Sequence, residues 1–210
     1  MGQRQPVFSI IIPTYDRPAQ LANCLKALAR LDYPHDRFEV LVVDDGSKTP
    51  PEALATSFRE RLDVRLLIQA HAGPAAARNT GAAQAKGRFL AFTDDDCMPA
   101  PDWLQTLAAR FASTPDQIIG GRTLNARSDN LYSTTSQTII EVVYAYYNTD
   151  PNQASFFASN NLAVPADRFR AISGFDATFT TSEDRELCDR WLHHSYRMMP
   201  PKSSCPTPTR

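Results

Sequence analysis

Three consecutive carboxylates, Asp94, Asp95 and Asp96, are the residues of this 210-residue chain best suited to chemistry. They directly follow the apolar run 89–93, which is typical of a strand buried on both faces of a parallel sheet. Because ligands of open α/β sheets bind outside the carboxyl ends of strands, we expect the cluster at a ligand site. Carboxylate oxygens are the ligands that Mg²⁺ and Mn²⁺ prefer, and such an ion would offset the repulsion among the three charges. The alternative is a solvated acidic turn, with one aspartate capping a helix that begins near Pro101.

A second acidic turn, the Asp-Asp-Gly-Ser segment 44–47, follows the apolar run 38–43 and should lie at the same edge. Taken alone, Asp45 is equally a turn former that bonds its own backbone. Together the two loops suit a nucleotide, because one carboxylate can accept a pyrimidine imino N–H while the other holds a metal on the diphosphate. No glycine-rich turn follows the first strand, so the phosphates need a cation and basic side chains such as Arg78. The alternative for Arg78 is a solvated helix face.

Composition limits the classes of protein to consider. The chain carries 22 Lys and Arg against 23 Asp and Glu, a formal net charge of −1, which gives no support to nucleic-acid binding. No apolar stretch reaches the length of a membrane span, and the amino terminus lacks the apolar region of a secretory signal. The cysteines have no paired spacing and indicate reduced thiols in a cytoplasmic protein. They are Cys24, Cys97, Cys188 and Cys205.

The elements that must position these residues alternate between strand and helix in the first half of the chain. Apolar runs predict strands at 7–12, 38–43, 64–68 and 89–93. Proline starts and apolar stripes predict helices from Pro18 onward and at 51–61, 74–86 and 101–112. After 118–121 the regular alternation of strand and helix ends. In the rest of the chain we expect a helix at 131–147, a strand at 156–164 and a final helix at 183–194. This order predicts an α/β fold with a mostly parallel central sheet and helices on both faces.

Seven segments, in order, resemble the family-two glycosyltransferases, which are inverting enzymes of the Rossmann-like GT-A fold. The segments are 8–17 (FSIIIPTYDR), 42–47 (VVDDGS), 77–81 (ARNTG), 92–96 (FTDDD), 158–164 (ASNNLAV), 174–176 (GFD) and 183–187 (EDREL). The resemblance covers residues 7 to about 192. It implies one domain over 1–198, with a nucleotide-sugar-binding half at 7–96 and an acceptor-side half at 97–198. The polar, Pro-rich tail 199–210 departs from the family pattern, as in a truncated or altered carboxyl terminus.

The resemblance also implies a donor site and a metal site. The implied donor-site residues are Pro13, Thr14, Tyr15, Asp45, Arg78, Asp94 and Asp95. Within that set, Thr14 and Asp45 contact uracil and Arg78 contacts the diphosphate. Asp94 and Asp96 form the Asp-x-Asp pair that binds Mg²⁺ or Mn²⁺, although some relatives coordinate the ion through the middle position, here Asp95.

The same resemblance implies that Asp184 is the catalytic base and that Asn161 and Glu183 lie on the acceptor side. An acceptor hydroxyl is a poor nucleophile at neutral pH, so a carboxylate separate from the metal must take its proton. Attack opposite the leaving group inverts the anomeric carbon and needs only one such base. The alternative for Asp184 is an acid in a helix capping box beginning at Thr181. The asparagine pair is alternatively a turn or a cap.

The expected reaction transfers a sugar, as a hexosyl or N-acetylhexosaminyl group, from a nucleotide-diphosphate sugar to an acceptor hydroxyl. By similarity the donor is a UDP-sugar and the acceptor a carbohydrate or glycolipid. The expected setting is cell-envelope polysaccharide or glycolipid synthesis at the inner membrane face, with peripheral association and no membrane anchor. The tyrosines at 144, 146 and 147 could stack on sugars, but at near-helical spacing they are more often packing residues.

Two other classes of protein stay open. One is a nucleotide-sugar-binding relative that has lost catalysis with its carboxyl-terminal part. The other is a haloacid-dehalogenase-like phosphohydrolase, which also places Asp-x-Asp after a strand. That class has Thr or Val two residues after the second aspartate, where this chain has Met98, and it gives no role to the turn at 44–47.

Overall fold

The computed structural model describes residues 5–121, 123–124 and 131–199. Its strands are β1 (Phe8–Thr14), β2 (Phe38–Asp44), β3 (Val64–Ile68), β4 (Phe89–Thr93), β5 (Ile118–Gly120), β6 (Asn161–Pro165) and β7 (Met198–Met199). Its α-helices are α1 (Pro18–Leu28), α2 (Glu52–Ser57), α3 (Pro74–Gln84), α4 (Trp103–Ser113), α5 (Leu131–Tyr147), α6 (Ala166–Ala171) and α7 (Glu183–His193), and a 3₁₀ turn spans His35–Arg37.

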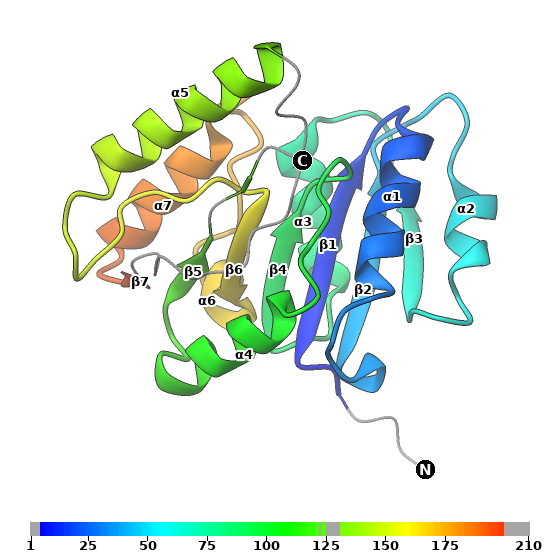
Figure 1. Cartoon of the computed structure of the whole chain (residues 1–210), viewed down its shortest axis with the longest axis horizontal. Helices are drawn as coiled ribbons and strands as arrows, with labels where there is room; N and C mark the ends of the chain where they lie inside the picture. Colours follow the sequence, from blue (N-terminus) through cyan, green and yellow to red (C-terminus); the bar gives the residue numbers. More distant parts are fainter. Residues whose placement is uncertain (1–4, 122, 125–130, 200–210) are drawn as a thin grey trace.

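The described strands form one sheet in the order β3-β2-β1-β4-β6-β5-β7 (Figure 1). β1 pairs in parallel with both β2 and β4, while β6 runs antiparallel to its neighbours β4 and β5. The predicted α/β fold with a mostly parallel sheet is therefore confirmed. The chain moves outward from β1 to β3 and then returns to place β4 on the other side of β1. That reversal is the topological switch point, where open α/β sheets bind ligands.

Helices cover both faces of the sheet because the central strands are apolar on both sides. Along β1, Ile11 packs in one cluster with residues of α3, α6 and α7, while Ile10 and Ile12 pack in the other with α1 and α4. Trp103 and Trp191 are almost fully buried, one on each face, and form part of the core. Burial of this kind is the main source of the fold's stability.

α3 lies unusually close to β1, and Gly81 permits that approach. A Cβ built on Gly81 would lie 2.6 Å from Cγ2 of Ile11, closer than side chains tolerate. The close packing brings the helix to the switch point, and Arg78 lies one turn earlier on the same helix. A short side chain at position 81 is therefore part of what positions Arg78.

Some predicted boundaries are wrong. The strand expected at 156–164 begins only at Asn161, because backbone N–H groups before it bond elsewhere: that of Phe156 to Asn148, that of Ala158 to the Tyr144 hydroxyl and that of Ser159 to Asp184. α2 ends at Ser57 instead of residue 61. The six-residue helix α6 was not predicted.

The carboxyl terminus also differs from expectation. Met199, assigned to the irregular tail, pairs with Ile119 in strand β7. The rest of the tail, 200–210, lies outside the described residues. None of the helices in the described part of the chain is long and apolar enough to cross a membrane.

Candidate active site

A cavity of about 350 Å³ opens at the switch point between the loops that follow β1 and β4. The parallel register brings the ends of β1, β2 and β4 to one edge, so their loops meet there. The lining residues are Pro13, Thr14, Tyr15, Arg17, Asp45, His71, Pro74, Arg78, Asp94 and Asp95. All seven residues predicted for the donor site are in this set. We call this space the donor cavity.

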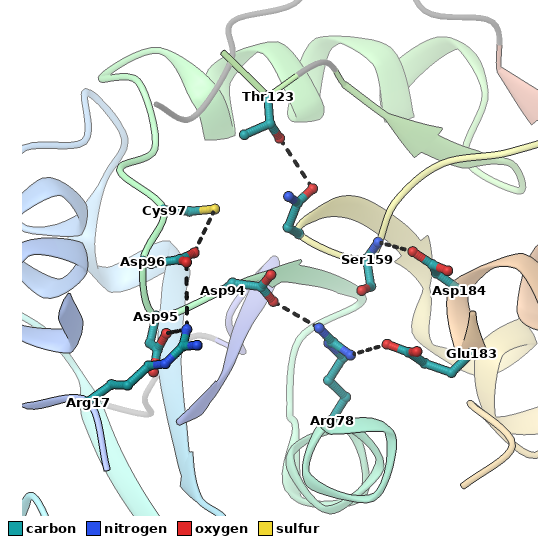
Figure 2. A network of polar contacts seen from close by, with 11 residues as sticks. Arg17, Arg78, Asp94, Asp95, Asp96, Cys97, Thr123, Ser159, Glu183 and Asp184 are labelled. Atoms are coloured by element: carbon teal, nitrogen blue, oxygen red, sulfur yellow. Dashed lines mark hydrogen bonds and ion pairs between the residues drawn. The ribbon is translucent and has the colours of Figure 1, made fainter. Parts of the chain in front are cut away.

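Asp95 ties the two loops of the donor cavity together. The Thr14 hydroxyl donates to Oδ2 of Asp95 at 2.7 Å, in a contact buried from solvent. Arg17 lies 3.5 Å from Oδ1 of Asp95 and 3.6 Å from Oδ2 of Asp96, so one guanidinium serves both carboxylates (Figure 2). Burial raises the pKa of Asp95, and the Thr14 hydrogen bond opposes that rise. Asp95 is thus a buried structural carboxylate, whereas Asp96 is partly open to solvent.

Asp45 organises the loop that precedes α3. Its carboxylate accepts Gln69 Nε2 at 2.7 Å and the backbone N–H groups of Ala72 and Gly73 at 2.9 and 2.8 Å. The Nδ1 atom of His71 lies 2.9 Å from Oδ2 of the same carboxylate. Asp45 therefore bonds a distant loop and not its own turn. Besides lining the donor cavity, it fixes His71 at the cavity wall, where that ring lies against Tyr15 at 4.4 Å between centroids.

Arg78 is buried between two carboxylates. Its Nη2 donates to Oδ1 of Asp94 at 2.8 Å and its Nη1 donates to Oε1 of Glu183 at 2.8 Å (Figure 2). The guanidinium also lies over the Phe175 ring, 5.6 Å from its centroid, and its buried Nε has no hydrogen-bond partner among the residues that the structure describes. The solvated-helix alternative for Arg78 is wrong, since only 3% of the residue is exposed.

A second cavity of about 260 Å³ adjoins the first at Asp94, which lines both. Its lining residues are Asp94, Ile139, Ile140, Val143, Tyr144, Phe156, Ala158, Ser159, Asn160 and Asp184. β6 is antiparallel to β4, with Thr93 opposite Asn161, so the residues before β6 lie next to the acidic triplet. We call this space the acceptor-side cavity.

Asp184 lies in the first turn of α7 and faces the loop before β6. Its Oδ1 accepts the N–H of Arg185 at 2.8 Å and its Oδ2 accepts the N–H of Ser159 at 3.4 Å. Among the described contacts the Asp184 carboxylate bonds Arg185 and Ser159 and not the backbone of Thr181, so the predicted capping box is not formed. Burial raises the pKa of Asp184, and the neighbouring Glu183 carboxylate raises it further. A carboxylate with a raised pKa is a stronger base than an ordinary aspartate.

The other predicted acceptor-side residues do not line this cavity. Asn161 is buried, and its Oδ1 accepts the Trp103 indole N–H at 3.1 Å. Its neighbour Asn160 lines the cavity instead and contacts Thr123 through Oδ1 at 3.2 Å. Glu183 does not line this cavity, and it contacts the site by accepting a hydrogen bond from Arg78.

Arg17 and His71 line the donor cavity and had no role in the prediction. Arg17 could have been found because it directly follows the strand-end segment 13–16. His71 stands two residues before the glycine that opens α3, but nothing in the sequence pairs it with Asp45.

The acidic triplet offers some, but not all, of the ligands that a divalent metal needs. Asp94 and Asp96 offer hard oxygen ligands from one short loop. Within the described ranges, however, no three His, Cys, Asp or Glu side chains are grouped to hold an ion. Arg78 and Arg17 contact the two carboxylates. A metal would therefore need further ligands from a bound molecule or water.

The chain matches the family described as Glycosyl transferase family 2 over residues 9–173, well over half of its length. It therefore belongs to this family, as the motifs predicted, and this membership removes the phosphohydrolase alternative.

Individual relatives agree with that assignment. Glycosyltransferase AglE of Haloferax volcanii is 38% identical over 123 residues, covering 58% of this chain and 40% of the relative. Validoxylamine A glucosyltransferase of Streptomyces hygroscopicus subsp. limoneus is 30% identical over 223 residues, covering 92% of this chain and 49% of the relative. The chain thus spans about half the length of these curated relatives.

Solved structures confirm the GT-A-type fold. Staphylococcus aureus TarS 1–349 in complex with UDP-GlcNAc superposes with a TM-score of 0.76 at 19% identity, covering 97% of this chain and 58% of that one. The mannosyltransferase PcManGT from Pyrobaculum calidifontis, in complex with GDP-Man and Mn²⁺, gives 0.78 at 21% identity, with coverages of 99% and 57%.

Proposed function

We propose that this chain transfers a sugar from a nucleotide-diphosphate sugar to an acceptor hydroxyl, with inversion and with a divalent metal. The observation that carries this proposal is the position of Asp94. It lines the cavity that holds every predicted donor residue and also the cavity that holds Asp184. A sugar bound through its diphosphate near Asp94 would place its anomeric carbon between the leaving group and the base, as in-line displacement requires.

The charges around the site support a metal-dependent donor. Five carboxylates lie close together, from the triplet 94–96, Glu183 and Asp184, and among the described residues Arg17 and Arg78 form ion pairs with members of this group (Figure 2). A diphosphate would add negative charge to an already negative cluster. Binding it without an additional cation would cost free energy.

Asp94 and Asp96 are the residues we expect to hold that cation. Mg²⁺ is usually bound by one or two carboxylates together with substrate phosphates and water, so a cluster of three side chains is not required. When bound, the ion would stabilise the negative charge that develops on the leaving diphosphate. Arg78 donates one hydrogen bond to Glu183, and its remaining N–H groups would donate to the same phosphates.

Asp184 is the residue we expect to take the proton from the acceptor hydroxyl. Two backbone N–H groups fix its carboxylate at the edge of the acceptor-side cavity. Inversion requires one base on the face opposite the leaving group, and Asp184 lies apart from the acidic triplet. Ser159 and Asn160, which line the same cavity, would contact the acceptor's polar groups.

For the donor we infer a UDP-linked hexose or N-acetylhexosamine. TarS, a similar fold, was solved with UDP-GlcNAc, whereas PcManGT was solved with GDP-Man, so base specificity needs a direct test. We place the reaction in polysaccharide or glycolipid synthesis at the cytoplasmic face of the membrane, where nucleotide sugars would be at hand.

A thermal-shift screen of UDP-, GDP- and dTDP-sugars with and without Mn²⁺ tests the proposal. Bound ligand stabilises a folded protein according to its concentration over its dissociation constant, so micromolar binding is detectable. We expect stabilisation by UDP-sugars that requires Mn²⁺, followed by UDP release when acceptor is added. Metal-dependent binding without any UDP release would support the impaired-relative alternative. No stabilisation by any nucleotide sugar would contradict the proposal.

A further inference from the structure

The lining of the acceptor-side cavity combines polar and apolar residues. Among the described lining residues, Asp94, Ser159, Asn160 and Asp184 contribute polar groups. The remaining lining residues come from α5 and from the chain just before β6, and we call them the apolar wall. Its residues are Ile139, Ile140, Val143, Tyr144, Phe156 and Ala158. The catalytic base we propose therefore shares its cavity with the apolar wall.

This wall suits an aliphatic group better than a free sugar. Sugar hydroxyls placed against Ile140 and Val143 would lose hydrogen bonds to water without replacement, at a cost of free energy. Stacking on aromatic faces is the usual compensation, but the two rings here are already engaged. Tyr144 packs edge-on against Phe156, with centroids 5.5 Å apart, and its hydroxyl accepts the N–H of Ala158 at 2.9 Å.

The apolar surface continues from the cavity to solvent. Ile139 lines the cavity while 59% of it is exposed, so it lies at the mouth. Farther along α5, Val142 and Tyr146 are 64% and 74% exposed. Glu141 is the one charged residue in the α5 sequence 131–147. A cavity built for a free saccharide is expected to open through polar residues, because saccharides carry hydroxyls on every edge.

We propose that the acceptor is amphipathic, with a hydroxyl beside Asp184 and an alkyl portion against Ile140 and Val143. The chemical class is a lipid-linked alcohol or glycoside. This inference rests on the proposed function and adds to it the class of acceptor. Because the apolar wall and Asp184 line the same cavity, we assign the alkyl group to the acceptor itself.

Matched glucosides test the proposal on the intact chain. Hexyl and methyl β-D-glucopyranoside share a headgroup, so the ratio of their dissociation constants reports the alkyl contribution even if glucose is not the natural sugar. Each fully buried methylene contributes about fourfold in affinity. With five additional methylenes partly buried, we expect the hexyl compound to bind at least about tenfold more tightly, measured by calorimetry in the presence of UDP and Mn²⁺.

Two adjacent valines provide the control. Val143 lines the cavity, whereas Val142 is exposed on the same helix and does not line it. We expect Val143→Ser to reduce the hexyl preference about fivefold and Val142→Ser to leave it within about twofold. UDP binding and the melting curve of each variant report whether it is folded.

Equal binding of the two glucosides, or equal effects of the two serine variants, would overturn the proposal. Equal binding is also the result expected if further residues of a longer protein, or a second copy, cover this wall. Failure of the proposed function is distinguishable, because it would appear as absence of metal-dependent UDP binding. Retained UDP binding without an alkyl preference would reject the acceptor class alone.

Discussion

Arg78 and Asp94 are joined by a hydrogen bond of 2.8 Å between α3 and the loop that follows β4. The same guanidinium reaches Glu183, which precedes the proposed base by one residue on α7. One buried side chain thus connects the donor cavity to the helix that carries Asp184. Because the two contacts use Nη1 and Nη2 of one planar guanidinium, the geometry depends on arginine and not only on positive charge.

Arg78→Lys should therefore weaken both stability and donor binding. Lysine keeps the charge but cannot donate to Asp94 and Glu183 from fixed, opposite arms. We expect a loss of about 1–3 kcal/mol in the free energy of unfolding, measured in urea, because two partly buried carboxylates each lose a hydrogen bond from Arg78. Arg88→Lys is the control, since Arg88 is exposed. Equal stability of the two variants would show that the bridge contributes nothing.

Thr14→Val should cost about 1–3 kcal/mol of stability, whereas Thr14→Ser should cost much less. Valine has the shape of threonine but removes the hydroxyl that donates to the buried Asp95 carboxylate at 2.7 Å. Serine keeps that hydroxyl. Chemical denaturation of the two variants compares them directly, and a serine variant as unstable as the valine variant would mean that packing, not the hydrogen bond, holds this position.

Asp184→Asn should abolish transfer and leave donor binding intact. Removing a general base lowers turnover by about 100- to 10,000-fold, while UDP binding depends on the other cavity. Asp189→Asn is the matched control, because Asp189 lies on the same helix, is half exposed and pairs only with Arg185 among the contacts described. Turnover retained in Asp184→Asn would remove Asp184 from the role of base.

The pH dependence of the reaction should reflect the raised pKa of Asp184. The base acts when ionised, so kcat/KM should fall as pH drops through that pKa, at a higher pH than an ordinary aspartate gives. Burial and Glu183 are the causes of the shift, and Glu183→Gln should move the acidic limb to lower pH. A pH–rate profile of both proteins measures this, and an unmoved limb would contradict the assignment.

The same shift predicts a stability change of known sign. A folded-state pKa above the unfolded value means that the folded protein binds more protons at intermediate pH. Stability therefore falls as pH rises through the pKa of Asp184, and the ionised group is unfavourable at neutral pH. Asp184→Asn should melt at a higher temperature than the parent at pH 7. The difference should shrink as pH falls through that pKa, and a lower melting temperature at pH 7 would contradict this.

The sheet and the donor loops could be predicted from local pattern. The runs that form β1 to β4 are mostly apolar, with Ser9, Glu39 and Arg65 as the polar residues inside them, and a chain buried on both faces of a parallel sheet favours that composition. Once these strands are parallel, the residues after each one must meet at a common edge. That is why Thr14, Asp45 and the acidic triplet were expected together, and why all the predicted donor residues line one cavity.

The remaining features depend on partners that are distant in sequence. The segment before β6 is held in part by the Asn148 side chain, which accepts the N–H groups of Ser155 and Phe156. The short strand β7 exists through pairing with β5, about eighty residues earlier, and its two methionines carry no strand pattern. Likewise, no spacing rule links Arg78 to Glu183 or His71 to Asp45. Such contacts arise only when the sheet has brought the loops together.

Calorimetric titration of Mn²⁺ into the protein, with and without UDP, tests the central claim most directly. We predict uptake of one Mn²⁺ per chain that is strengthened by UDP, abolished in Asp96→Ala and retained in Asp102→Ala, whose exposed side chain makes no capping bond at the start of α4. Absence of Mn²⁺ and Mg²⁺ uptake even with UDP present, or undiminished uptake by Asp96→Ala, would contradict the assignment of the acidic triplet as the metal and diphosphate site.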